Sequence, residues 1–189
     1  SLLPFKGLYW KLKKDCPLNI KTNLYPVPDL NVPFLGVHFT PSADIVPIIN
    51  IGPTATPAFG RENYKLFQGI ETNFLLSNLT ILARQYLLNI DGFRKYVHEQ
   101  SMLIMPHLFL KSAQELLPSL KSSYIEPSDK VGIRAQLFNK KTKSLENDFL
   151  CLRAYKSTHV LNSISPAFTA SFSLADYIID NYILYNIKD

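Results

Sequence analysis

The sequence predicts an α+β fold, in which a mixed, largely antiparallel sheet is interrupted by a helical excursion. Two changes of hydrophobic period indicate this fold. Apolar residues alternate with polar ones in the first third, recur every three or four residues from Arg61 to about Leu120, and alternate again from Val131. With 189 residues, 47% of them hydrophobic, the chain is long enough to bury a core.

The first third is expected to form strands joined by proline-rich corners. In a strand over residues 8–13, Leu8, Trp10 and Leu12 fall on one face, as in a half-buried strand. A rigid turn at 25–29 (YPVPD) precedes a second strand in which Leu35, Val37 and Phe39 share one face. The sheet is expected to continue over 45–51, with Pro47 favouring an edge or a bulge.

Helical periodicity then predicts helices that break at Asp91-Gly92 and at Pro106 and end at Pro118. Strands are expected over 131–138, 149–152 and 158–162, with a turn at the Lys-Thr-Lys segment 141–143. A closing helix is predicted from Pro166 to Tyr182, because Ser165 can cap it and proline suits a first helical position. Its apolar stripe is expected to face a core and comprises Phe168, Phe172, Ala175, Ile179 and Tyr182.

Charge and cysteine content exclude several classes of function. The formal net charge is +5, but the basic residues are scattered apart from Lys140, Lys141 and Lys143, which argues against a nucleic-acid surface. Cys16 and Cys151 form neither a disulfide framework nor a metal-ligand pattern, so a reducing compartment and no metal are expected. The longest apolar run is too short to span a bilayer, so no transmembrane segment is expected.

Four polar side chains stand out as candidates for chemistry. Arg134 and Gln136 would share one face of a strand about 7 Å apart, and a guanidinium binds carboxylates through two parallel hydrogen bonds. An ion pair with a structural carboxylate is the alternative for Arg134. His159 and His38 can each accept a hydroxyl proton near neutral pH, or can be hydrogen-bonded core histidines. No serine lies in a GxSxG elbow, which argues against a hydrolase triad.

The start of the closing helix is a second candidate. Ala167, Ala170 and Ser171 are small, so a bulky group could approach the free backbone N–H groups there. A helix N-terminus carries about half a positive charge and favours an anion. Close packing of the helix on a strand is the alternative.

Six segments, in this order, resemble the C-terminal part of the FAD-dependent L-2-hydroxyglutarate dehydrogenases (oxidases), within the group related to D-amino-acid and glycine oxidases. The resemblance covers nearly the whole chain, more loosely from about Lys65 to Tyr124. The segments are PFKGLYWKL, YPVPDLNVPFLGVHFTP, GPTATPAFGRENY, GIRAQL, DFL and THVLNSISPAFTASFSLADYI.

This resemblance implies a D-amino-acid-oxidase-like fold, with 1–130 as a substrate-binding domain and 131–189 completing the FAD-side half. It implies that Arg134 anchors the substrate carboxylate, with Gln136 and His38 as further substrate-binding residues and His159 as a candidate base. Residues expected beside the flavin are Gly132, Asn162, Ser165, Pro166, Ala167, Phe168 and Thr169.

The chain departs from the family in lacking the GxGxxG segment that holds the FAD pyrophosphate. The N-terminal dinucleotide-binding half is therefore expected to be missing, and this chain alone to be inactive. Leu161 also stands where relatives carry Arg, and Ile45 where they carry Gly. The implied reaction is oxidation of L-2-hydroxyglutarate, or a similar 2-hydroxy acid, to the 2-oxo acid.

The expected electron acceptor is oxygen or a membrane quinone, and the expected location is the cytoplasm, including the inner face of a membrane. Two alternatives remain for the function. One is an amine- or glycerol-3-phosphate-oxidising flavoprotein of the same group, and the other is a non-catalytic binding module.

Overall fold

The computed structural model describes residues 1–27, 36–163 and 168–183 and divides the chain into two compact units. Residues 4–134 form the first, here called the sheet unit, and residues 1–3 with 135–189 form the second, the hairpin unit. The predicted border between residues 130 and 131 falls within the last strand of the sheet unit. The assignment of 1–130 as a substrate-binding domain stays a prediction.

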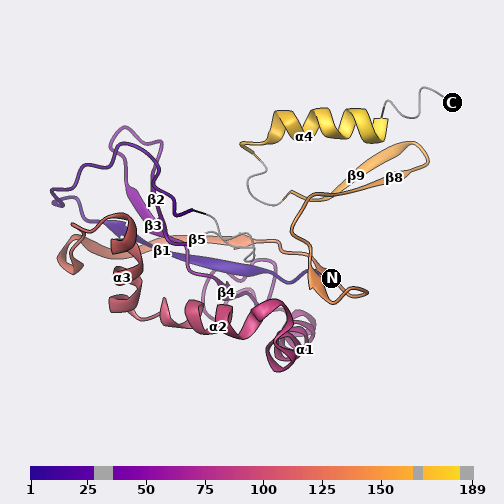
Figure 1. Ribbon diagram of the computed structural model, residues 1–189, viewed down its shortest axis with the longest axis horizontal. Helices are drawn as coiled ribbons and strands as arrows, with labels where there is room; N and C mark the ends of the chain where they lie inside the picture. The colour runs from indigo at the N-terminus through magenta and orange to yellow at the C-terminus, as the bar shows by residue number, and fades with distance from the viewer. Residues whose placement is uncertain (28–35, 164–167, 184–189) are drawn as a thin grey trace. The chain divides into compact units, whose positions relative to one another are not determined.

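A five-stranded sheet forms the centre of the sheet unit (Figure 1). Its order is β2-β3-β1-β4, and β5 pairs with the other edge of β1. Every pairing among the described strands is antiparallel, so the predicted α+β class is confirmed at this level. The strands are β1 (Phe5–Leu12), β2 (His38–Pro41), β3 (Ile49–Gly52), β4 (Thr56–Pro57) and β5 (Ile125–Arg134).

The strand predicted over 45–51 is too long at its start. Residues 43–46 are bends and β3 begins only at Ile49. Pro47 cannot donate a hydrogen bond to a neighbouring strand, and Ile45 and Val46 are exposed instead of facing a core. Residues 28 and 29 of the turn predicted at 25–29, and Leu35 of the second strand, lie outside the described residues.

The helical excursion contains α1 (Thr72–Leu88), the short η1 (Ile90–Gly92), α2 (Phe93–Met102) and α3 (Pro106–Leu116). The predicted breaks are confirmed: Asp91 and Gly92 have positive φ, Pro106 occupies the first turn of α3, and α3 ends before Pro118. The predicted helical start at Arg61 is wrong, because residues 61–71 form a loop. Gly60 and Gly69 meet there so closely that a Cβ on Gly60 would lie 2.0 Å from the Gly69 carbonyl oxygen.

Asn63 holds this loop together. Its side chain is fully buried and donates to the carbonyl oxygens of Lys65 (2.7 Å) and Gln68 (2.8 Å). Its Oδ1 accepts from the backbone N–H of Phe59 (3.2 Å) and from the ammonium of Lys6 on β1 (3.1 Å). The loop is therefore fastened to the strand that pairs with β5.

The main core lies between the sheet and α3. Phe109 and Ala113, one turn apart on α3, are fully buried, and Phe109 contacts Trp10 of β1 with ring centroids 5.7 Å apart. Buried apolar residues from β1, β2, β3 and β5 complete the core: Leu12, Phe39, Ile49, Ile51 and Ile125. The predicted burial of Leu8 is wrong, since 39% of that residue is exposed.

The hairpin unit contains β6 (Phe138–Asn139), β7 (Ser144–Leu145), β8 (Leu150–Ala154), β9 (Ser157–Asn162), α4 (Ser171–Ile178) and the π-helical turn η3 (Ile179–Ile183). The predicted turn at 141–143 joins β6 to β7, and the predicted strands 149–152 and 158–162 form the antiparallel pair β8–β9. The strand predicted over 131–138 is confirmed over 131–134 only, because β5 begins earlier, at Ile125, and ends at Arg134.

The closing helix differs most from its prediction. It begins at Ser171, after a turn that includes Phe168 and Thr169, and Ser165, Pro166 and Ala167 lie outside the described residues. Four of the five residues of its predicted core stripe are exposed, Phe168 at 92% and Phe172 at 88% among them, and only Tyr182 is half-buried. The other half-buried residues are Ala170, Leu174 and Ile178, on a different stripe.

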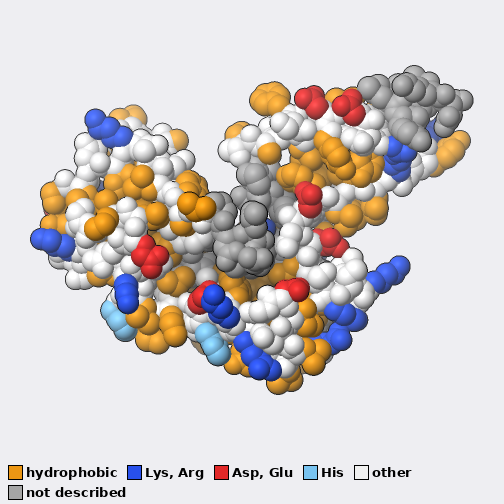
Figure 2. Space-filling model, viewed as in Figure 1, with side chains coloured by type: hydrophobic (Ala, Val, Ile, Leu, Met, Phe, Trp, Pro, Cys, Tyr) orange, Lys and Arg blue, Asp and Glu red, His pale blue; other side chains and the backbone are white. Residues whose placement is uncertain are grey.

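The hairpin β8–β9 contacts the π-helical turn η3, which follows α4. Arg153 of β8 donates to the Asn181 carbonyl oxygen, and its guanidinium lies 5.5 Å from the centroid of the Tyr182 ring. Since both stripes are apolar and this unit has few large buried side chains, periodicity alone could not choose between them. Figure 2 shows apolar side chains gathered on the surface of this unit.

Candidate functional site

Arg134 is the last residue of β5 and lies within the sheet unit. Its cross-strand neighbour is Phe5 of β1, so the two side chains share one face of the sheet. Burial lowers the pKa of Arg134, and the neighbouring Tyr96 of α2 opposes that shift. Burial also raises the pKa of Tyr96, and Arg134 lowers it. The phenol is therefore neutral near pH 7, and the guanidinium charge is not cancelled by Tyr96.

Gly132 precedes Arg134 by two residues, so it points to the same face of β5. No atom lies within 4 Å of the position that a Cβ on Gly132 would take. Its partner Gly7 differs: a Cβ there would meet Pro53 at 2.4 Å. The backbone of β5 is thus unobstructed at Gly132, and a flat ligand could approach it closely there.

Tyr9 of β1 and Lys130 of β5 form a cluster with Tyr25 and with His38 of β2. The Lys130 ammonium stands 4.8 Å from the centroid of the Tyr9 ring, a cation–π contact. Tyr25 stacks on the ring of His38 with centroids 4.3 Å apart. Burial raises the pKa of Tyr9, and Tyr25 adds to this shift.

The tautomer of His38 follows from its hydrogen bond. Nδ1 lies 2.9 Å from the carbonyl oxygen of Gly36, which can only accept, so Nδ1 carries the proton and Nε2 the lone pair. Burial lowers the pKa of His38, and Lys130 lowers it further, against the hydrogen bond to Gly36. Near neutral pH, His38 is thus an uncharged ring able to accept a proton at Nε2.

The other predicted site residues belong to the hairpin unit. His159 is exposed, and its Nε2 lies 2.9 Å from the Ser157 hydroxyl. Asn162 is buried: it accepts from the Leu150 N–H and donates to the Asp148 carbonyl oxygen (2.8 Å), which holds the start of β8 against β9. Phe168 and Thr169 are exposed in the turn before α4.

Gln136 does not share a strand face with Arg134. It is fully buried in the hairpin unit, where its amide donates to the carbonyl oxygens of Glu146 (2.5 Å) and Leu137 (3.3 Å). The expected common face is absent because β5 ends at Arg134. The roles proposed for Gln136, His159, Asn162, Phe168 and Thr169 stay predictions.

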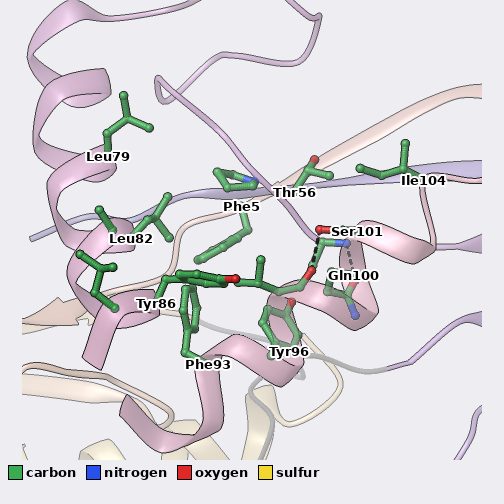
Figure 3. A pocket seen from close by; sticks show the side chains of 15 residues that line it. Phe5, Thr56, Leu79, Leu82, Tyr86, Phe93, Tyr96, Gln100, Ser101 and Ile104 are labelled. Carbon is green, nitrogen blue, oxygen red and sulfur yellow. Dashed lines mark hydrogen bonds between the residues drawn. The ribbon is translucent and has the colours of Figure 1, made fainter. Parts of the chain in front are cut away.

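A cavity of about 460 Å³ lies in the sheet unit between β1, β4, α1 and α2 (Figure 3). Phe5, Tyr86, Phe93 and Tyr96 turn their rings into it, and leucines of α1 form the opposite wall. Two of its polar residues bind backbone: Gln100 Oε1 accepts from the Ala55 N–H, and the Ser101 hydroxyl donates to the Val97 carbonyl oxygen. A mainly apolar lining would not stabilise the charges of a small dicarboxylic acid. The unobstructed backbone at Gly132 is therefore the better candidate site.

Sequence reasoning did not identify the contact between Tyr9 and Lys130. Lys130 was assigned to no strand, because the strand was predicted to start at Val131, and Tyr9 was taken as an ordinary outward residue. The alternation of Lys130, Gly132 and Arg134 was the available signal, provided that the strand is extended backwards. Among the described helices, none combines the length and apolarity that a membrane span requires.

No family model matches the chain. Comparison with curated proteins finds L-2-hydroxyglutarate dehydrogenases. The one from Indibacter alkaliphilus is 34% identical over 188 residues, covering 95% of this chain and 44% of that protein. The human mitochondrial one is 33% identical over 184 residues (95% and 38%), and that of Escherichia coli K12 is 31% identical over 180 residues (94% and 41%). The resemblance inferred from the sequence is confirmed, although the chain spans less than half the length of these relatives.

Proposed function

We propose that this chain, a relative of the L-2-hydroxyglutarate dehydrogenases, is the C-terminal part of an FAD-dependent enzyme that oxidises L-2-hydroxyglutarate or a similar 2-hydroxy acid. Similarity over 94% to 97% of the chain supports the assignment. The structural observation that carries it is the half-buried Arg134, at the end of β5 and two residues from the open backbone of Gly132. The D-amino-acid-oxidase-like fold is part of this proposal.

The residues present fit a flavin in part. The unobstructed backbone at Gly132 would let a planar ring approach the strand, whereas no GxGxxG segment occurs in this chain to hold a pyrophosphate. When bound, the flavin would supply the acceptor for the hydride from C2 of the substrate. The dinucleotide part would then be held by another part of the full-length protein.

Arg134 would bind the C1 carboxylate of the substrate through two charge-assisted hydrogen bonds. Partial burial strengthens such bonds because less water competes for the guanidinium. The carboxylate then fixes the position of C2, and positioning of this kind is a large part of catalysis.

A base must take the hydroxyl proton of the substrate. His159 is the candidate from the sequence, and its exposed ring shares a hydrogen bond with Ser157. His38 is a second candidate, favoured by a specific observation: it is held neutral with its lone pair at Nε2, in the same unit as Arg134.

The test uses the full-length protein that contains this chain. L-2-Hydroxyglutarate should bleach the flavin absorbance anaerobically, and the D-enantiomer should not. Arg134→Ala should raise KM by about ten- to hundred-fold, since a charge-assisted pair is worth about 1.5–3 kcal/mol. Arg84→Ala, which removes an exposed arginine of α1, is the matched control. An unchanged KM in Arg134→Ala would eliminate the proposed anchor, and a protein without flavin would overturn the assignment.

A further inference from the structure

The cavity between β1, β4, α1 and α2 presents apolar and aromatic surface to a ligand. None of the described side chains that line it carries a charge. Aliphatic side chains of α1 form one wall, and four aromatic rings turn inwards, those of Phe5, Tyr86, Phe93 and Tyr96 (Figure 3). The part of a ligand that enters this cavity must therefore be uncharged.

Polar groups of the lining are bound to the protein itself. The Thr56 hydroxyl donates to the carbonyl oxygen of Lys6 (3.1 Å), and the Tyr86 hydroxyl lies 2.9 Å from Nε2 of His98. The side chains of Gln100 and Ser101 are likewise bound to backbone groups. A polar ligand would gain few hydrogen bonds in exchange for those that it makes with water, so an apolar one is favoured.

The size of the cavity suits a ligand of about two rings. An apolar protein cavity of about 150 Å³ holds one benzene ring. This cavity has about 460 Å³, which leaves room for two fused rings and a group attached to them. Aromatic walls favour an aromatic ligand, because rings gain from offset-stacked and edge-to-face contacts beyond the area that they bury.

A guanidinium lies beside two residues of the lining. Arg94 of α2 donates through Nε to the carbonyl oxygen of Tyr86 (2.7 Å) and through Nη2 to that of Leu87 (2.5 Å). Its Cζ lies 5.9 Å from the centroid of the Tyr86 ring, and both Tyr86 and Leu87 line the cavity. These contacts hold the exposed side chain of Arg94 in place and use two of its five N–H donors.

The charge of Arg94 is not neutralised by an ion pair. Among the described residues, none of the ion pairs includes Arg94. The carbonyl oxygens at the end of α1 balance part of its charge, as a cation at a helix C-terminus does. A carboxylate could still accept charge-assisted hydrogen bonds from the remaining donors.

We propose that this cavity binds an aromatic carboxylic acid of about two rings, with its rings between α1 and α2 and its carboxylate at Arg94. The inference does not rest on the proposed function, because it involves neither a flavin nor the substrate anchor Arg134. Arg134 is not among the described residues that line the cavity.

The experiment titrates the full-length protein by isothermal titration calorimetry with 2-naphthoate and with 2-naphthalenemethanol, which has the same rings but no charge. One molecule of 2-naphthoate should bind, about three- to tenfold more tightly than the alcohol, as expected for a charge-assisted contact at an exposed side chain. Arg94→Met should remove this difference by weakening the binding of 2-naphthoate alone, and Arg94→Lys should keep part of it. Lys95→Met is the matched control, because it removes one charge from the next, equally exposed position of α2.

A second pair of variants tests whether the rings enter the cavity. Ala83 lines it from α1, so Ala83→Phe should fill part of the space and weaken the binding of both compounds by about tenfold or more. Arg84→Phe adds the same ring at an exposed position outside the lining and should weaken neither. Circular dichroism checks that each variant is folded.

The outcomes that overturn the inference are distinct from a failure of the proposed function. The inference fails if neither compound binds, if both bind equally tightly, or if Arg94→Met or Ala83→Phe leaves the affinity for 2-naphthoate unchanged. It also fails if Arg134→Ala weakens the binding of 2-naphthoate, because the compound would then occupy the substrate site. Bleaching of the flavin by L-2-hydroxyglutarate is a separate measurement, so either proposal can fail while the other stands.

Discussion

Asn63 provides the sharpest test of how the sheet unit is held together. In Asn63→Ala the side chain loses two donated and two accepted hydrogen bonds, to Lys65, Gln68, Phe59 and Lys6. Lys6 can still bind the backbone oxygens of Asn63 (3.3 Å) and Lys65 (3.4 Å). The Phe59 N–H has no such substitute and would be left without a partner.

Each lost hydrogen bond costs about 1 kcal/mol, and the buried Phe59 N–H that is left without a partner costs more. Asn63→Ala should therefore lower the free energy of unfolding by about 3–5 kcal/mol. Urea titration followed by fluorescence of Trp10, which packs on Phe109, measures this loss. Asn63→Asp should lose less, because it keeps an acceptor for Lys6 and Phe59. Asn73→Ala, on the exposed start of α1, should change stability by less than about 0.5 kcal/mol. A loss below about 1 kcal/mol in Asn63→Ala would refute the assignment of Asn63 as the centre of this loop.

Three further predictions concern charge and space. Burial lowers the pKa of Lys6, so the folded state binds fewer protons than the unfolded state between the lowered pKa and 10.5. The free energy of unfolding of the wild type, relative to that of Lys6→Met, should therefore rise as the pH increases through that window. If urea titrations give the wild type and Lys6→Met the same pH dependence, this reasoning is contradicted. For His38, nitrogen NMR should show the Nδ1–H tautomer and a pKa below 6.5; a charged ring at pH 7 would oppose the assigned hydrogen bond to Gly36. Gly132→Leu should leave the urea midpoint nearly unchanged, since the space is open, but should reduce kcat/KM of the full-length enzyme by more than tenfold. An unchanged kcat/KM in Gly132→Leu would show that no ligand binds against the backbone at Gly132.

The sequence was most informative where one local rule acts alone. Asp91-Gly92 and Pro106 break the helices as expected, because a left-handed residue and a missing N–H act through their own backbone. The pair β8–β9 was likewise predicted from alternation and a turn.

Predictions failed where tertiary contacts decide between equal local choices. The loop at 61–71 has helix-like spacing, but the side chain of Asn63 and the contact between Gly60 and Gly69 fix another conformation. On α4, two adjacent apolar stripes compete, and the one that contains Leu174 and Ile178 is half-buried. The cluster of Tyr9, Tyr25, His38 and Lys130 joins separate segments, and spacing within one segment could not predict it.

The position of β5 at the border of its sheet has a further consequence. Among the described residues β5 pairs only with β1, so its outer row of backbone groups could recruit a foreign strand and begin aggregation. Pro127 has no N–H to donate to a new strand, and the charges of Asp129 and Lys130 oppose a close apolar neighbour. The charged residues that precede Gly132 and Arg134 on β5 would thus protect an exposed margin of the sheet against unwanted self-association.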